Sequence, residues 1–273
     1  MSDPTPGIQR TRSWLVTLHT IFAKELRSFL CTPFGWVLLA CTMALQGFWL
    51  QAAIQTMSKA TGEGVMYYLL NNIHFWFYFI FIFPLITMRS MAEEERLGTL
   101  EGLLTAPVTT TQIVLGKYLA ALLFYITLWL PLLLYPWMSD IGNWYTQLRY
   151  GIAPEGRIIY HPADWYGPIS ILTLCGSFFI ALGIFCSSLT RSQIIAAIIC
   201  TCLMIMYYFT GRVTELWGEF PAAPLFHYLS CTEQISAFSR GLVDTRPLVL
   251  YLSLAIFTLA LTVRVVDYRR WHR

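Results

Sequence analysis

Long stretches without a charged side chain constrain this chain more than any other feature of its sequence. The first runs from Ser28 to Ser58, and others of similar apolar character follow almost to the C-terminus. About 20 apolar residues in a helix suffice to cross the hydrocarbon core of a membrane. Charged residues make up 12% of the chain, against about 25% in an ordinary soluble domain. The sequence therefore predicts an all-α integral membrane protein.

Six segments qualify as membrane spans or nearly do so. They are Phe34–Ile54, Val65–Met88, Ile113–Met138, Tyr166–Leu189, Ser192–Gly211 and Pro247–Val263. We assign residues 1–33 to an N-terminal region on the cytoplasmic side, 34–266 to one six-helix transmembrane domain and 267–273 to a basic cytoplasmic tail. Basic residues interrupt any apolar core before the first span, so a cleavable signal peptide is not expected.

The distribution of lysine and arginine predicts the orientation. One side of the predicted topology holds Arg10, Arg12, Lys24, Arg27, Arg89, Arg96, Lys117, Arg191, Arg264, Arg269, Arg270 and Arg273. The other side holds half as many, namely Lys59, Arg149, Arg157, Arg212, Arg240 and Arg246. Because short cytoplasmic loops carry the excess of basic residues, we expect both termini to lie in the cytoplasm.

Three segments outside the spans have patterns of their own. Trp14–Leu30 places apolar residues on one side of a helix, which is typical of a helix lying flat in the membrane interface. Asp140–Trp165 is polar and rich in tyrosine, so we expect an ordered external loop. Leu225–Leu242 is too short and too polar to span, which favours a re-entrant or interfacial helix before the last span.

A search for chemistry in the chain is negative. Gly116-Lys117 is followed by Tyr118, with no glycine at the spacing of a phosphate-binding loop, and neither an HExxH nor a GxSxG motif occurs. The seven cysteines lie mostly inside apolar runs and do not indicate a disulfide framework. Cys200/Met204 and Cys202/Met206 share helix faces and carry soft ligands for Cu(I), but packing residues are the favoured reading. We expect no catalytic residue, no metal site and no nucleic-acid binding.

The segment between the second and third spans is the most informative. It begins with Glu93, Glu94, Glu95 and Arg96, continues with Leu97, Gly98, Thr99, Leu100, Glu101 and Leu104, and ends at Pro107. Acidic residues suit a helix N-terminus, and the leucines form an apolar edge. The pattern predicts a short helix that docks into a partner, with Gly98 permitting close approach or local bending. The alternative is a solvated loop that merely connects two helices.

This segment resembles the acidic, Gly-Thr-Leu-Glu coupling segment of ABC-2 type permeases. Lys24-Glu25-Leu26 is similar to the connecting interfacial helix of that family, and Arg240, Gly241 and Asp244 lie in a stretch similar to its outer gate region. Within the family, the chain resembles most the permeases associated with gliding motility and with copper-enzyme maturation. The resemblance covers almost the whole chain.

The resemblance implies a half-transporter. Two such permease subunits, identical or paralogous, would combine with separate ATP-binding subunits in a bacterial inner membrane, and the partner rather than this chain would bind ATP and Mg²⁺. The membrane lipids are the remaining expected partner.

Three functions stay open on the sequence. The first is ATP-driven export or extraction of a substrate. The second is a membrane subunit of a motility or assembly machine that transmits force from the ATPase to an outer partner without moving solute. The third is a secondary transporter, which the scarcity of ionisable residues within the spans disfavours. For Glu25 we expect a contact to a basic group of the ATPase or of the coupling segment.

Overall fold

The computed structural model describes residues 6–57, 64–98, 108–150, 162–213, 221 and 223–271. Within these ranges the chain forms helices and no strand. In chain order they are α1 (Pro6–Cys31), α2 (Pro33–Met57), α3 (Val65–Leu70), α4 (Ile73–Thr87), α5 (Ala92–Arg96), α7 (Thr110–Tyr150), α8 (Pro162–Leu189), α9 (Gln193–Thr210), α11 (Ala223–Leu229), α12 (Cys231–Ser239) and α13 (Arg246–Trp271). The predicted all-α fold is confirmed.

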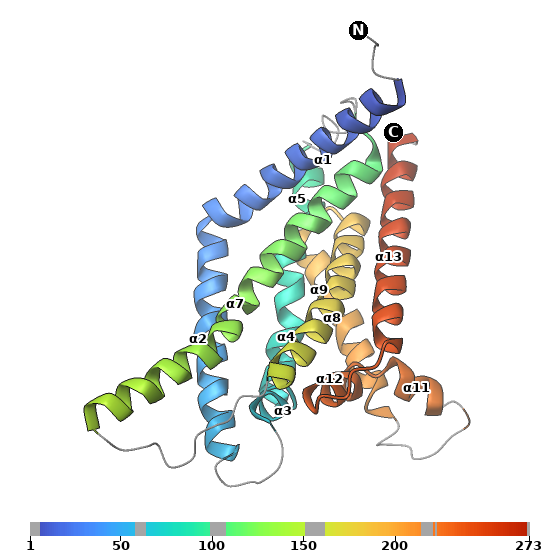
Figure 1. Cartoon of the computed structure of the whole chain (residues 1–273). Coiled ribbons are helices and arrows are strands. Elements are labelled where there is room, and N and C mark those ends of the chain that lie inside the picture. Colours follow the sequence, from blue (N-terminus) through green and yellow to red (C-terminus); the bar gives the residue numbers. More distant parts are fainter. Residues whose placement is uncertain are drawn as a thin grey trace.

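Six of the described helical segments are long and apolar enough to cross a membrane. They are Pro33–Ala53, Ile73–Arg96, Thr110–Leu134, Trp165–Leu189, Gln193–Thr210 and Arg246–Arg269. Figure 1 shows these segments as a bundle, with α1 and α5 at the same end as the C-terminal end of α13. Because six crossings return a chain to the side on which it started, this arrangement fits the span count. We call this end the α1 end and the opposite one, which carries α3, α11 and α12, the α3 end.

The predicted second span is interrupted near its start. Val65–Leu70 forms the separate helix α3, and α4 begins only at Ile73. Asn71 ends α3 with its backbone N–H on the Tyr67 carbonyl, and the Asn72 side chain accepts a hydrogen bond from the backbone N–H of His74 at 3.0 Å. Asparagine side chains compete with the helical backbone pattern in this way, so two of them in succession separate the helices.

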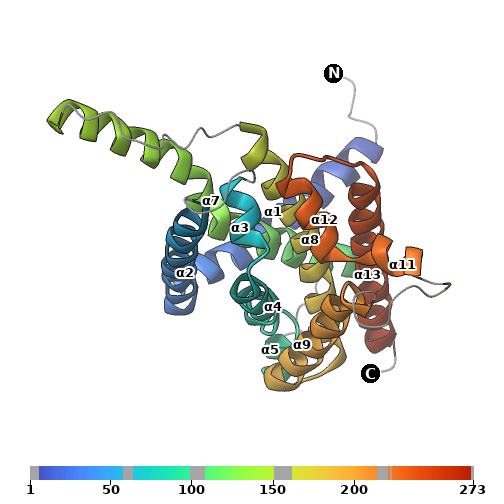
Figure 2. The same ribbon diagram turned by 90° about the horizontal axis from the view of Figure 1, so that it is seen from below.

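The helix that contains the third span continues beyond the predicted end of that span, so the expected loop begins later. Helix α7 runs from Thr110 to Tyr150, so residues 140–150 are helical rather than loop. This stretch contains no proline, and the next proline in the sequence is Pro154. The last turns of α7 project away from the bundle (Figures 1 and 2). Residues 151–161 lie outside the described part of the chain.

The remaining differences concern helix ends. Helix α1 begins at Pro6, upstream of the predicted Trp14, and α13 continues to Trp271, beyond the predicted Val263. The predicted outer helix is split into α11 and α12 at Ser230, whose hydroxyl accepts from the Glu233 backbone N–H at 3.2 Å and so begins a new helix.

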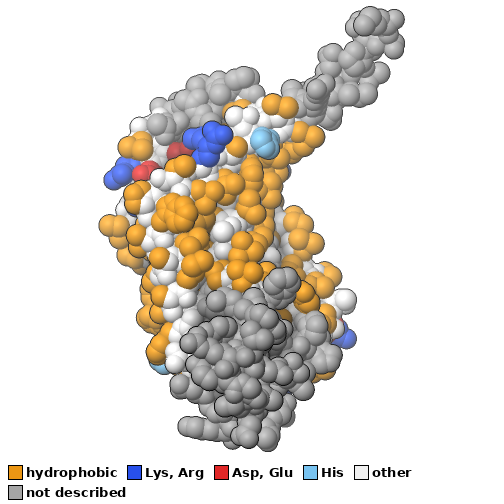
Figure 3. All heavy atoms as spheres, turned by 60° about the vertical axis from the view of Figure 1, so that its left-hand side comes forward, with side chains coloured by type: hydrophobic (Ala, Val, Ile, Leu, Met, Phe, Trp, Pro, Cys, Tyr) orange, Lys and Arg blue, Asp and Glu red, His pale blue; other side chains and the backbone are white. Residues whose placement is uncertain are grey.

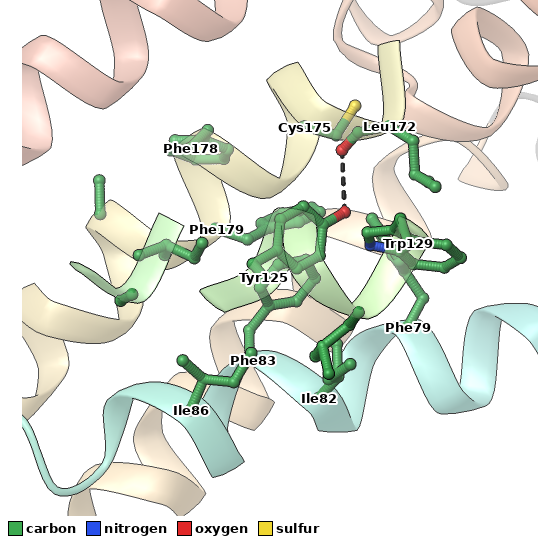
Figure 4. Close-up of a cluster of buried hydrophobic side chains, with 14 of the residues drawn as sticks. Phe79, Ile82, Phe83, Ile86, Tyr125, Trp129, Leu172, Cys175, Phe178 and Phe179 are labelled. Carbon is green, nitrogen blue, oxygen red and sulfur yellow. Dashed lines mark hydrogen bonds between the residues drawn. The ribbon is translucent and has the colours of Figure 1, made fainter. Parts of the chain in front are cut away.

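Aromatic side chains from α4, α7 and α8 form the centre of the bundle (Figure 4). Phe79 and Phe83 lie in edge-on contact at 4.9 Å between ring centroids, and Tyr125 lies 5.2 Å from Phe83. The Tyr125 hydroxyl donates to the Leu172 carbonyl at 2.9 Å, which satisfies the only polar atom of that side chain. A side chain at Gly176 would collide with the Tyr125 ring, so the glycine is what lets α7 and α8 pack closely here.

Candidate functional site

A group of charged side chains gathers at the α1 end of the molecule, above a face that is largely hydrophobic (Figure 3). The short helix α5, which contains the predicted coupling glutamates, lies at this end (Figure 1). Its surroundings therefore decide which coupling residues face the bundle and which face outward.

Lys117 is the centre of the cluster. Its side chain is only 2% exposed, and its Nζ lies 3.1 Å from Glu25 Oε1 and 3.0 Å from Glu94 Oε1. A buried ammonium is costly unless it is paired, so two carboxylates around one lysine are a stable arrangement. Because the three residues belong to α7, α1 and α5, this single amine joins the interfacial helix and the coupling helix to the start of the third span.

Lys24 adds a second cation on the outside of the same cluster. Its Nζ lies 3.3 Å from Glu94 Oε1 and 3.7 Å from Glu25 Oε1, and its side chain is 65% exposed. Partial burial lowers the pKa of Lys24, but the neighbouring carboxylates of Glu94 and Glu25 outweigh this and raise its pKa overall. Lys24 is therefore charged across the physiological range and balances the second carboxylate.

Glu95 makes a second connection from α5. Its side chain is 4% exposed; it accepts from Arg191 Nε at 3.1 Å and also pairs with Arg269. Arg191 lies in the turn between α8 and α9, and Arg269 lies near the end of α13. Glu94 and Glu95 are thus both directed into the subunit, and together they connect α5 with α1, α7, α13 and the α8–α9 turn.

Ser187 of α8 holds the backbone that enters α5. Its Oγ accepts hydrogen bonds from the backbone N–H groups of Met91 and Ala92, each at 3.1 Å, and donates to the Met88 carbonyl at 3.1 Å. The first N–H groups of a helix have no partner within the helix, so an outside acceptor is needed when they are buried. Ser187 thereby fixes the start of α5 on α8.

The end of α5 faces outward. Arg96 is exposed, and so is Leu97, at 62%. Gly98 follows with a φ of +69°, a left-handed conformation that favours glycine, and a Cβ built there would touch nothing. This geometry favours local bending at Gly98, and close approach to a partner stays a prediction. Glu93 is half-exposed. Thr99, Leu100, Glu101, Leu104 and Pro107 lie outside the described residues.

Helix α1 packs its apolar side along α7. A Cβ at Gly116 would lie 2.7 Å from Ile21, so the two helices cross closely at this glycine. Gln112 Nε2 donates to the Trp14 carbonyl at 3.1 Å. Nearer the end of α1, where half-buried Leu26 follows Lys24 and Glu25, the Phe29 ring stacks on Phe124 at 4.9 Å. The third span thus covers part of the apolar side that was predicted for the helix at Trp14–Leu30.

The residues of the predicted outer gate lie at the α3 end, far from the coupling helix. Arg240 stands 4.7 Å from the centroid of the Tyr67 ring and donates to its hydroxyl at 2.8 Å, which connects α12 with α3. Gly241 has a φ of +78° and turns the chain after α12. Asp244 accepts from the backbone N–H of Arg246 at 3.1 Å and caps α13.

The structure therefore brings Lys24 and Glu25 of the predicted interfacial helix together with Glu94 of the coupling segment, and leaves the outer residues apart. The sequence reading did not single out Lys117, Ser187, Arg191 or Arg269 as site residues. Lys117 carried a usable signal, because an ionisable residue inside a predicted span needs a partner. The residues next to Ser187, Arg191 and Arg269 in the sequence give no indication of these contacts, since their partners lie far away in the chain.

Comparison with known proteins bears on most of the chain. A family model described as ABC-2 family transporter protein matches residues 30–230, which include α5, Lys117 and Arg191. No curated protein matched the chain in a sequence search. The match is to the family as a whole, so the resemblance to the motility and copper-enzyme branches stays a prediction.

Proposed function

The chain belongs to the ABC-2 family of transporter proteins, and from that premise we propose that it exports a substrate across the membrane, or extracts one from it, with ATP hydrolysed by a separate subunit. As a family member it is a multi-pass membrane subunit of a transporter that works with an ATP-binding subunit. ATP and Mg²⁺ belong to that partner in this proposal, and a second permease subunit completes the pathway.

The α1 end faces the cytoplasm of a bacterial cell in this proposal. The support is the gathering of basic side chains there, including Lys24, Lys117, Arg191 and Arg269, because basic residues are retained on the cytoplasmic side. Helix α5 is then accessible to a cytoplasmic ATPase, and both termini are cytoplasmic.

The observation that carries the coupling role is the inward direction of Glu94 and Glu95. Both carboxylates pair with cations of the permease itself, so α5 is attached to α1, α7, α13 and the α8–α9 turn. A displacement of α5 by the ATPase would consequently move several spans together. Among the described residues of the coupling segment, Arg96 and Leu97 are exposed on the outward side, where the ATPase can touch them.

A substitution on that outward side tests the proposal. We expect Leu97→Asp to weaken pull-down of the ATP-binding subunit and to reduce substrate-stimulated ATPase activity in reconstituted membranes, because a charge in an apolar docking groove is costly. Leu225→Asp is the matched control, since Leu225 is similarly exposed, at 58%, but lies on α11 at the α3 end. Wild-type pull-down and ATPase activity in Leu97→Asp would exclude the docking role.

A transport assay addresses the force-transmission alternative. Movement of a labelled substrate that depends on ATP supports export or extraction. ATPase activity that responds to an outer partner without any solute movement favours the motility or assembly role instead.

A further inference from the structure

A cavity of about 680 Å³ lies beside the ion-pair cluster at the α1 end. Its walls come from the end of α1, the first turn of α2, the end of α4, helix α5 and Lys117 of α7. Apolar side chains form part of this wall, including Phe29, Phe34, Leu85 and Ile86. The cavity thus has a charged part and an apolar part, as a site for an amphiphile requires.

The position of the cavity matches the boundary of a membrane. The span formed by α2 begins at Pro33, the span that contains α4 ends after the cavity-lining residues Leu85 and Ile86, and the span of α7 begins at Thr110. The charged wall therefore lies where lipid headgroups meet the protein, and the apolar wall continues toward the acyl chains.

The charges of the wall do not cancel. Lys24, Arg27, Arg89 and Lys117 line the cavity against Glu25, Glu93 and Glu94, four cations to three carboxylates. The two lysines pair with Glu25 and Glu94 as described above.

The two arginines are different from the lysines. Neither Arg27 nor Arg89 forms an ion pair with any residue that the structure describes. The Phe34 ring positions Arg89, whose Cζ lies 4.5 Å from the ring centroid. This contact does not use the N–H donors of the guanidinium, which can therefore bind another group. A guanidinium presents a planar set of donors that matches phosphate oxygens, and pairs of this kind are stronger than neutral hydrogen bonds.

We propose that this cavity binds an anionic phospholipid, with the headgroup phosphate between Arg27 and Arg89 and the beginning of an acyl chain against Phe29, Phe34, Leu85 and Ile86. The net positive wall selects an anionic over a zwitterionic headgroup. Because Glu93, Glu94 and Leu97 of the coupling segment line the same cavity, a bound lipid contacts the segment that faces the ATPase. Lipid binding does not depend on the proposed transport direction or on the ATPase contact.

Titration of the purified full-length chain with short-chain phosphatidylglycerol, followed by native mass spectrometry, tests the site. We expect Arg27→Gln and Arg89→Gln each to weaken binding several-fold, and the double variant about tenfold or more, since each loses a charge-assisted bond. Arg264→Gln is the matched control: Arg264 is an exposed arginine on α13 that does not line the cavity, and this variant should bind as the wild type does. All of these side chains are exposed, so the fold should tolerate the changes.

Two ligands complete the experiment. Phosphatidylcholine carries the phosphate without net charge and should bind more weakly than phosphatidylglycerol, and inorganic phosphate lacks the acyl chains and should not displace the lipid at equal concentration. The proposal is overturned if Arg264→Gln weakens binding as much as the cavity variants, if phosphatidylcholine binds equally well, or if inorganic phosphate alone competes fully.

Discussion

The two ends of the bundle are held together by different interactions. At the α1 end, buried or nearly buried carboxylates of α5 pair with Lys117, Arg191 and Arg269 from helices far away in the chain. At the α3 end, the His227–Glu233 side-chain contact and the Arg246–Asp244 ion pair are largely exposed and local. The other polar contacts there are single hydrogen bonds and helix caps, such as Ser230 on the Glu233 backbone, while Met66, Leu69, Ile235 and Phe238 pack into the apolar core.

This difference bears on how each end can move. Removing one partner of a buried ion pair leaves an uncompensated charge, whereas losing an exposed pair costs little and losing a helix cap costs about 1 kcal/mol. Helix α5 is therefore attached to the bundle through buried charges and can transmit a displacement. The helices of the α3 end are held by apolar packing, and their polar contacts are individually weak. Four substitutions test this contrast, from the largest expected effect to the smallest.

Lys117→Met should have the largest effect. It leaves Glu25 and Glu94 facing each other without their buried cation, and we expect the free energy of unfolding in mixed micelles to fall by about 3 kcal/mol. Lys24→Met removes a cation from the same two carboxylates, but one that is mostly exposed, so its cost should stay below about 1 kcal/mol. Equal losses of unfolding free energy in the two variants would mean that burial of the ion pairs does not distinguish the α1 end from the α3 end.

Ser187→Ala tests whether neutral contacts also hold α5. The backbone N–H groups of Met91 and Ala92 lose their acceptor, and an unsatisfied buried donor is expensive, so we expect a loss of about 2 kcal/mol in unfolding free energy. The neighbouring Ser188 is also buried, but its hydroxyl donates only to the Phe185 carbonyl of its own helix. Ser188→Ala should therefore lower the free energy of unfolding by less than Ser187→Ala does. Equal losses in the two variants would contradict the role of Ser187 in holding α5.

Gly98→Ala should loosen the end of α5 locally. A side chain disfavours the left-handed backbone at φ +69°, at a cost of about 1 kcal/mol. Hydrogen exchange of the α5 amides should then speed up, while exchange in α8 stays unchanged. Gly98→Asn should behave more mildly, because asparagine tolerates this conformation. Unchanged exchange in Gly98→Ala would show that the bend is not needed to hold α5.

Tyr67→Phe should have the smallest effect, at the α3 end. It removes the hydroxyl that accepts from Arg240 but leaves the ring beneath the guanidinium. Because Arg240 is exposed, a double-mutant cycle with Arg240→Gln should give a coupling energy of about 0.5 kcal/mol. A coupling energy as large as the loss in Lys117→Met would remove the distinction between the two ends.

The sequence by itself determined the properties that depend on neighbouring residues. The spans could be located because a run of apolar residues long enough to cross a membrane is visible in any window of the chain. The coupling segment could be recognised because its acidic and leucine residues lie close together. The ends of elements were less predictable: the Asn71–Asn72 break depends on capping bonds that compete with a strong apolar pattern, and it was missed.

Only the tertiary structure decided what the coupling residues contact. The sequence predicted a helix that docks into a partner without saying which of its side chains face that partner. The fold turns Glu94 and Glu95 toward Lys117, Arg191 and Arg269 and leaves Arg96 and Leu97 outside. Glu25 and Lys117 are 92 positions apart, and Arg269 lies 174 positions from Glu95. Ion pairing depends on distance in space and on exclusion of water, and neither is fixed until the helices pack.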